Sequence, residues 1–196
     1  MADDDLISTV KKFSVFNSKS DDIHGFPHVS RVYELCLQIG KRLNANLTTL
    51  GIAALLHDVG RIKEKTDEKG RNHADISAEI ALNFLKNQNH SLSQKDIENI
   101  INAIRAHSFS NNVTPDTIEA KILSDSDKLD ALGAIGLYRT IAFTIQRGGA
   151  LTQVIHHLDN KILKLKDQMH LDTSKKIAEL KEEIIMDFYR KIKDGL

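Results

Sequence analysis

The sequence predicts an all-α protein, and three observations support this fold class. Leu, Ile, Ala, Lys and Glu prevail among the 196 residues, and these residue types favour helix over sheet. Only two prolines occur, so few positions interrupt a helix. Apolar residues recur at helical spacing along much of the chain. With 41% apolar residues the chain can build one domain with a substantial core, and we expect a single-domain helical bundle.

The first two predicted helices differ in the width of their apolar faces. Residues 28–43 carry one apolar stripe, and Pro27 stands just before it, where its missing N–H costs little. Residues 48–58 are apolar on almost every side, which is typical of a central, buried helix. Gly60 is expected to end that helix in the left-handed conformation. The charged residues 61–71 predict an exposed loop.

Three further helices are predicted in the middle of the chain. Residues 74–88 have helical apolar spacing, and Ser93 opens the next helix with Asp96 three residues on, a weaker form of the capping box. Thr114-Pro115 predicts the start of a helix that runs to about Lys128.

The C-terminal part predicts a helical hairpin. Gly148-Gly149 marks a turn, and apolar stripes over residues 151–169 and 177–188 indicate two long antiparallel helices. A partner-binding coiled coil is the alternative, and an intramolecular hairpin is the simpler solution. We therefore divide the chain into a catalytic helical part, residues 1–147, and a hairpin packed on it, residues 148–196.

Composition and charge exclude several classes of protein. Lys and Arg total 27, as do Asp and Glu, and the net charge of zero argues against broad nucleic-acid binding. Cys36 is the only cysteine, so no internal disulfide can form, and we expect a buried thiol. The N-terminus lacks the basic start and apolar run of a signal peptide, and no apolar stretch is long enough to span a bilayer. We expect a cytoplasmic protein without membrane association.

The dipeptide His57-Asp58 is the most informative feature of the sequence, together with His28 and Asp127. A single His-Asp pair is weak evidence, and a helix-terminal His beside a capping Asp is the alternative. However, the pair ends an apolar helix, where each unpartnered polar group would cost roughly 2–7 kcal/mol. Two imidazoles and two carboxylates suit Mn, Fe, Co, Ni or Zn. Magnesium suits them less, because it prefers oxygen ligands.

Three segments of the sequence resemble the HD superfamily of metal-dependent phosphohydrolases. They are His24-Gly25-Phe26-Pro27-His28-Val29-Ser30-Arg31-Val32, Ala53-Ala54-Leu55-Leu56-His57-Asp58-Val59-Gly60-Arg61, and the run from Leu123 to Gly133 that contains Asp125, Asp127 and Asp130. The order and spacing of the three segments make the resemblance specific, and it is strongest over residues 20–140. The stretch from His157 to Met169 is similar to the tail of a bacterial subgroup of HD-domain proteins.

The resemblance implies a role for each candidate residue of the site. It makes the metal ligands His28, His57, Asp58 and Asp127. Periodicity alone leaves Asp125 as an alternative to Asp127; the resemblance favours Asp127, with Asp125 orienting a ligand imidazole and Asp130 structural.

Further residues match positions that contact a second ion or the phosphate in relatives. We expect one tightly held ion, with a second one left open. The expected catalytic residues are Asp58, Arg61, His73 and His107, and the expected substrate contacts are Arg61, His73, His107 and Lys128. The other basic residues of the loop are expected to be mostly solvated: Lys63, Lys65, Lys69 and Arg71.

The sequence therefore predicts a phosphohydrolase that uses metal-activated water. The expected substrate is a small phosphorylated metabolite, and the superfamily resemblance favours a nucleotide. The alternatives are a non-catalytic metal- or nucleotide-binding regulator of the same fold and a helical interaction module that depends on its C-terminal hairpin. The sequence leaves homo-oligomerisation open.

Overall fold

The computed structural model describes residues 2–195, while the side chains of residues 2–4 and of Lys65 lie outside the description. Within residues 2–195 every regular element is a helix, which confirms the predicted all-α fold class. The chain divides into two compact units, Met1–Ser124 and Asp125–Leu196. Each unit is described by itself, and the predicted division after residue 147 stays a prediction.

The first unit contains five helices and the start of a sixth, whose bounds are α1 Ala2–Phe16, α2 Phe26–Arg42, α3 Leu47–Leu56, α4 His73–Lys86, α5 Gln94–His107 and α6 Ile118–Asp130. The sequence did not predict α1, because its buried stripe includes a polar residue. Leu6, Val10 and Ser14 follow each other at intervals of four residues and are buried. Ser14 donates a hydrogen bond to the carbonyl oxygen of Leu55 at 2.5 Å, which ties α1 to the end of α3.

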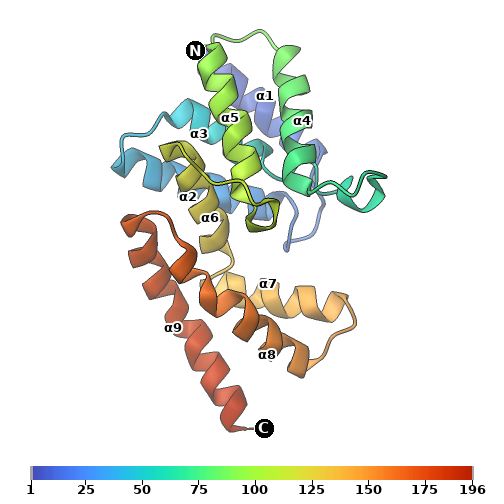
Figure 1. Cartoon of the computed structure of the whole chain (residues 1–196), viewed down its shortest axis with the longest axis vertical. Coiled ribbons are helices and arrows are strands. Elements are labelled where there is room, and N and C mark those ends of the chain that lie inside the picture. The colour runs from blue at the N-terminus through green and yellow to red at the C-terminus, as the bar shows by residue number, and fades with distance from the viewer. Residues whose placement is uncertain (1, 196) are drawn as a thin grey trace. The chain divides into compact units, whose positions relative to one another are not determined.

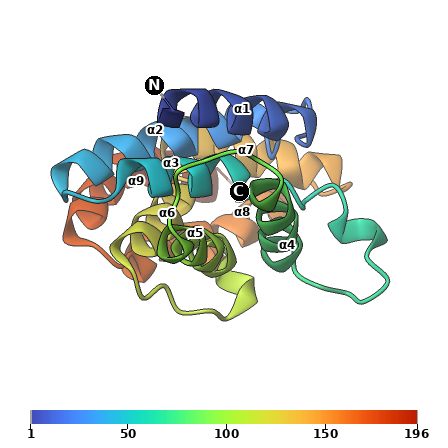
Figure 2. The ribbon, with the colours of Figure 1, turned by 90° about the horizontal axis from the view of Figure 1, so that it is seen from above.

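Helix α3 is the centre of the first unit, as its apolar sequence predicted. Residues 49–56 are all buried, and α3 contacts α1, α2, α4 and α5. Figure 1 shows α4 and α5 side by side, and Figure 2 shows α1 on one side of α3 with α4 and α5 on the other. Because α3 is in contact with these four helices, a residue at its C-terminal end is surrounded by protein.

The prediction of a left-handed Gly60 is wrong, since positive φ angles occur among the described glycines only at Gly70, Gly133 and Gly148. The need for glycine is steric instead. A Cβ at Gly60 would lie 2.5 Å from the backbone nitrogen of Ser77 and 2.9 Å from the carbonyl oxygen of His73. The Gly60 N–H also donates to Ser77 Oγ at 2.9 Å. Glycine thus lets α4 pack directly on the turn that follows α3.

The starts of three helices test the capping predictions. Ser93 and Asp96 form the predicted capping box of α5. Helix α4 begins at His73, one residue before its predicted start, because the Asn72 side chain accepts the N–H of Ala74. Helix α6 begins at Ile118 rather than at Thr114-Pro115, because the Thr117 hydroxyl accepts the N–H of Ala120 and caps the helix there.

The second unit contains the rest of α6 and three further helices, α7 Gly133–Gln146, α8 Leu151–Asn160 and α9 Asp172–Asp194. Gly148, with a φ angle of +78°, forms the predicted turn after α7. The predicted continuous helix over residues 151–169 is wrong: α8 ends at Asn160, and two 3-10 turns follow, Ile162–Lys164 and Lys166–Gln168. The Asn160 side chain donates to the carbonyl oxygen of His156, in competition with the helical backbone bond. Helix α9 packs on α7 and on both turns.

No helix among the described residues combines the length and the apolar composition needed to cross a membrane.

We predict that Gly60→Ala destabilises the protein by about 1–3 kcal/mol, because the new Cβ meets α4 backbone that cannot move independently. Urea unfolding followed by circular dichroism measures this free energy. The control is Gly195→Ala, whose Cβ would meet its nearest atom at 3.5 Å and should leave the free energy unchanged. A Gly60→Ala protein as stable as this control would contradict the steric account.

Candidate metal centre

Two buried histidines stand at helix ends, and each turns one ring nitrogen back to its own helix. His57 follows α3, and its Nδ1 lies 2.6 Å from the carbonyl oxygen of Ala54. His107 ends α5, and its Nδ1 lies 2.6 Å from the carbonyl oxygen of Ile104. The last carbonyls of a helix have no partner within the helix, so they accept these N–H groups. Nδ1 therefore carries the proton in both rings, and Nε2 keeps its lone pair for another group.

His28, His57 and Asp58 form a cluster of donor atoms that we call cluster A. His28 is the third residue of α2, and all three side chains are buried. The Nε2 atoms of His28 and His57 lie 3.3 Å apart, and they lie 3.8 and 3.9 Å from Oδ2 of Asp58. These three residues are spaced to share one metal ion.

Asp58, His73 and His107 form a second cluster, which we call cluster B. Oδ1 of Asp58 lies 3.6 Å from Nε2 of His73 and 3.6 Å from Nε2 of His107, which is too far for a hydrogen bond. Among the described residues, Oδ1 of Asp58 and Nε2 of His107 are buried without a hydrogen-bond partner. Burial of each polar atom without a hydrogen bond costs about 1–3 kcal/mol of stability. The occurrence of two such atoms side by side therefore indicates that a further group completes the site.

Arg61 joins the two clusters. Its Nε donates to Oδ2 of Asp58 at 2.6 Å, and its Nη2 donates to Nε2 of His73 at 3.0 Å. Since a guanidinium has no acceptor, Nε2 of His73 is unprotonated and Nδ1 carries the proton. That Nδ1 lies 3.1 Å from Oε1 of Glu64, which accepts its N–H. A chain of hydrogen bonds thus runs from Glu64 through His73 and Arg61 to Asp58.

The surroundings keep Asp58 ionised and His73 neutral. Burial raises the pKa of Asp58, but Arg61 and the histidines around it outweigh burial and hold that pKa well below 3.8. Burial, and then the positive charge of Arg61, lower the pKa of His73 from 6.5 to about 4. An ionised carboxylate and imidazoles with free lone pairs are the protonation states that metal ligands require.

The residues of cluster A fit a divalent transition metal. Ligand atoms about 2.1 Å from one ion lie about 3.0–3.4 Å apart at octahedral or tetrahedral angles. The His28–His57 separation matches this range, and Oδ2 of Asp58 needs to approach by only a few tenths of an ångström. Two nitrogens and one oxygen are the donor set that Mn, Fe, Co, Ni and Zn accept. Cluster A can therefore hold a divalent ion, which agrees with the metal binding expected from the sequence, while the identity of the metal stays a prediction.

The predicted site residues of α6 belong to the second unit. Asp127 as a ligand and Lys128 as a substrate contact thus remain predictions. Both oxygens of Asp125 accept backbone N–H groups, from His170 at 2.9 Å and Leu171 at 3.0 Å. Asp130 pairs with Arg139 at 2.6 Å. These bonds give Asp125 and Asp130 structural roles within the second unit.

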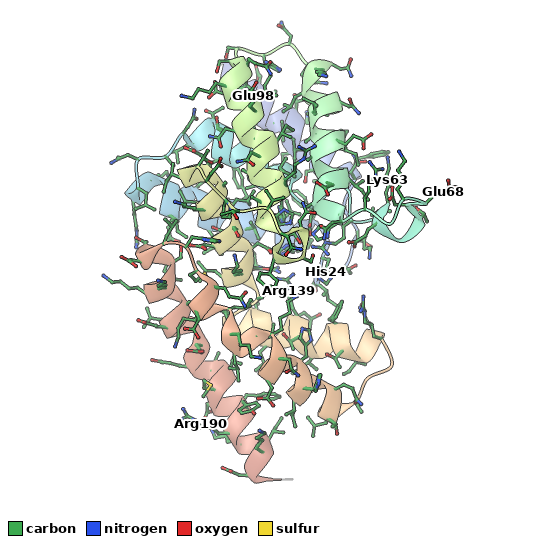
Figure 3. All side chains as sticks on the ribbon, in the orientation of Figure 1. His24, Lys63, Glu68, Glu98, Arg139 and Arg190 are labelled. Atoms are coloured by element: carbon green, nitrogen blue, oxygen red, sulfur yellow. The ribbon has the colours of Figure 1, made fainter. Side chains whose placement is uncertain are left out.

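The loop between α3 and α4 contributes one residue that the sequence did not single out. Glu64 lies among charged residues of the loop, and only its bond to His73 distinguishes it. Lys63 and Lys69 are exposed, as expected, and the side chain of Lys65 lies outside the described residues. Arg71 pairs with Asp67 and Glu79. Figure 3 shows Lys63 and Glu68 on this loop, with Glu68 at its outer tip.

Comparison with known proteins finds a matching family and a similar relative for most of the chain. The family model described as HD domain matches residues 25–132. A relative described as an uncharacterised protein, YpgQ of Bacillus subtilis, is 29% identical over 181 residues, which are 88% of this chain and 84% of YpgQ.

Solved structures share the fold over more than nine tenths of both chains. The structure of Bacillus subtilis YpgQ in complex with ADP has a TM-score of 0.78 at 26% identity, and the match covers 100% of this chain and 97% of the YpgQ chain. A structure described as a predicted HD superfamily hydrolase from an uncultured Thermotogales bacterium has a TM-score of 0.69 at 25% identity, and the match covers 97% of this chain and 91% of that one.

We predict that metal-free protein loses stability as the pH falls from 6.5 toward 4. The pKa of His73 is lower in the folded than in the unfolded chain, so the unfolded chain binds more protons in this range. The stability that neutral His73 contributes is therefore complete above pH 6.5 and declines below it. Thermal unfolding at pH 5–7 with chelator should show a shallower decline for His73→Gln than for the wild type.

The control for this experiment is His156→Gln, which changes an exposed histidine of α8. Its stability should fall with pH in parallel with the wild type. If His73→Gln also runs parallel to the wild type, the lowered pKa of His73 is refuted.

Proposed function

The chain belongs to the HD domain family, and we propose that it is a phosphohydrolase that cleaves a phosphate ester or phosphoanhydride of a small metabolite. The observation that carries the proposal is cluster A, where two imidazole nitrogens and one carboxylate oxygen lie within 3.9 Å of one another. Cluster B adds support, because the second oxygen of the Asp58 carboxylate and the nearby Nε2 of His107 are buried without a hydrogen bond.

A divalent ion supplies the acid–base part of this chemistry when it is bound, since it lowers the pKa of water and polarises a phosphoryl oxygen. The protein's part is to hold and orient. His28, His57 and Asp58 would hold the ion, and we propose Asp127 as the fourth ligand. Asp58 would also orient the attacking water through its second oxygen.

Arg61 is the proposed phosphate contact. Its guanidinium is charged at every physiological pH, and its side chain is 23% exposed, so it can offset negative charge on phosphoryl oxygens. His73 fixes the position of this guanidinium. Nε2 of His107 lies 3.6 Å from Oδ1 of Asp58, the carboxylate that Arg61 also contacts. We propose His107 and Lys128 as further substrate contacts. Burial lowers the pKa of Lys128, although Asp125 and Asp127 oppose that effect.

A nucleotide is the proposed substrate. The support is the similarity to YpgQ, whose structure was determined in complex with ADP. The bond that is cleaved remains open between a monoester, a pyrophosphate linkage and a cyclic diester. A cytoplasmic location remains a prediction from the sequence.

A non-catalytic nucleotide-binding regulator is the second candidate, because the same ligands could hold an ion for structure alone. The two candidates differ in one measurement: a regulator binds nucleotide but releases neither phosphate nor pyrophosphate.

We predict that His57→Ala combined with Asp58→Ala abolishes metal binding and hydrolysis together, since the change removes two of the three donors of cluster A. Metal content is measured by elemental analysis. Hydrolysis is measured with a panel of nucleoside mono-, di- and triphosphates and cyclic nucleotides, with phosphate and pyrophosphate detected separately.

The matched control is His156→Ala combined with Asp167→Ala, which removes the same two residue types from exposed positions of the second unit. It should keep metal and activity. Stoichiometric metal in the His57/Asp58 variant would contradict the ligand assignment, and a metal-loaded wild type inactive on the whole panel would favour the regulator.

We predict that chelator-treated protein recovers activity with Mn²⁺, Co²⁺ or Ni²⁺ and at least tenfold less with Mg²⁺ at equal concentration. The physical reason is that imidazole nitrogens bind these transition metals well, whereas Mg²⁺ prefers oxygen. Initial rates after titration with each metal measure the difference. Equal recovery with Mg²⁺ would mean that the two histidines do not both bind the ion.

A further inference from the structure

We propose that Arg61 takes the place of a second metal ion, so that the centre holds one ion per chain, and that removal of its guanidinium opens cluster B to a second ion. The proposal rests on the proposed binding of an ion at cluster A. It goes beyond that function because it states how many ions the centre holds and which residue limits the number.

Cluster B has the donors that an ion needs. Asp58 divides its two oxygens: Oδ2 faces His28 and His57, and Oδ1 faces His73 and His107 at 3.6 Å each. The side chains of Asp58 and His107 are each 1% exposed, and neither Oδ1 nor His107 Nε2 has a hydrogen-bond partner among the described residues. These two buried atoms are therefore available as donors to an ion.

Arg61 competes for the third donor of cluster B. Nε2 of His73 accepts the Nη2–H of Arg61 at 3.0 Å, so its lone pair is occupied. Glu64 holds the other side of the ring by accepting from Nδ1, which prevents His73 from offering that nitrogen instead. An ion in cluster B would have to displace Arg61 from His73.

Charge strengthens this competition. The guanidinium cannot lose its proton in a protein, so its positive charge is permanent. It lies 2.6 Å from Oδ2 of Asp58, the same carboxylate that cluster B needs through Oδ1. A second divalent ion would face both this fixed charge and the ion of cluster A across one carboxylate. Without the guanidinium, the lone pair of His73 Nε2 is available to an ion, and the negative charge of Asp58 is no longer offset by Arg61.

The test is the number of Mn²⁺ ions per chain after equilibration and removal of free metal, measured by elemental analysis and by electron paramagnetic resonance. We expect one ion and an uncoupled Mn²⁺ signal in the wild type. Arg61→Gln should bind two ions and give an exchange-coupled signal, because two ions that share a carboxylate lie about 3.5–4 Å apart.

Two further variants assign the second ion. Arg61→Gln combined with His107→Ala removes a donor of cluster B and should return to one ion. Arg71→Gln is the matched control, because it removes an arginine of the same loop that pairs with Asp67 and Glu79. It should keep one ion. Arg61→Ala is measured beside Arg61→Gln, so that a folding defect in one variant does not end the test.

The outcomes separate this inference from the proposed function. A wild-type protein that binds no ion overturns both. Two ions in the wild type overturn the inference alone. A single ion in Arg61→Gln and Arg61→Ala, with circular dichroism like that of the wild type, also overturns it alone.

Discussion

The burial of Asp58 is the constraint on which the rest of the centre depends. Its carboxylate follows the central helix α3 and is ionised in spite of burial, which is costly unless other groups compensate for the charge. Arg61 and the surrounding histidines provide that compensation, and each lies on a segment that packs around the end of α3. The packing of α4 on Gly60 brings His73 into this group. The packing of the helices therefore also brings together the groups that stabilise the buried charge of Asp58.

Helix ends provide the orientation of the histidine rings. Ala54 and Ile104 each offer a carbonyl oxygen that the helix itself does not use, and the rings of His57 and His107 satisfy them. In this way the backbone selects the tautomer that leaves Nε2 available. Glu64 fixes the same tautomer in His73 by means of a side chain, and there Nε2 accepts from Arg61. Ligand orientation thus follows largely from where the helices stop.

The sequence predicted those parts of the fold and the site that depend on local pattern. The apolar residues of α3 indicated a buried centre, Ser93 with Asp96 fixed the start of α5, and His57-Asp58 indicated the cluster. It could not predict the reason for Gly60, because a Cβ there would meet α4, whose position depends on the whole bundle. The bond of Glu64 to His73 depends in the same way on the path of an irregular loop. The early end of α8 escaped prediction because an apolar stripe continues through two 3-10 turns.

The four histidines come from helix ends of opposite polarity. His28 and His73 stand at the N-termini of α2 and α4, while His57 and His107 stand at the C-termini of α3 and α5. The partial charges of two N-termini and two C-termini offset one another. The charges of the Asp58 carboxylate and the Arg61 guanidinium cancel likewise. Within the described residues of the first unit, the centre of this group has no surplus positive charge to attract a phosphate. For the proposed phosphate substrate the attraction would then come from the proposed ion, so charge balance favours binding of the metal before the anion.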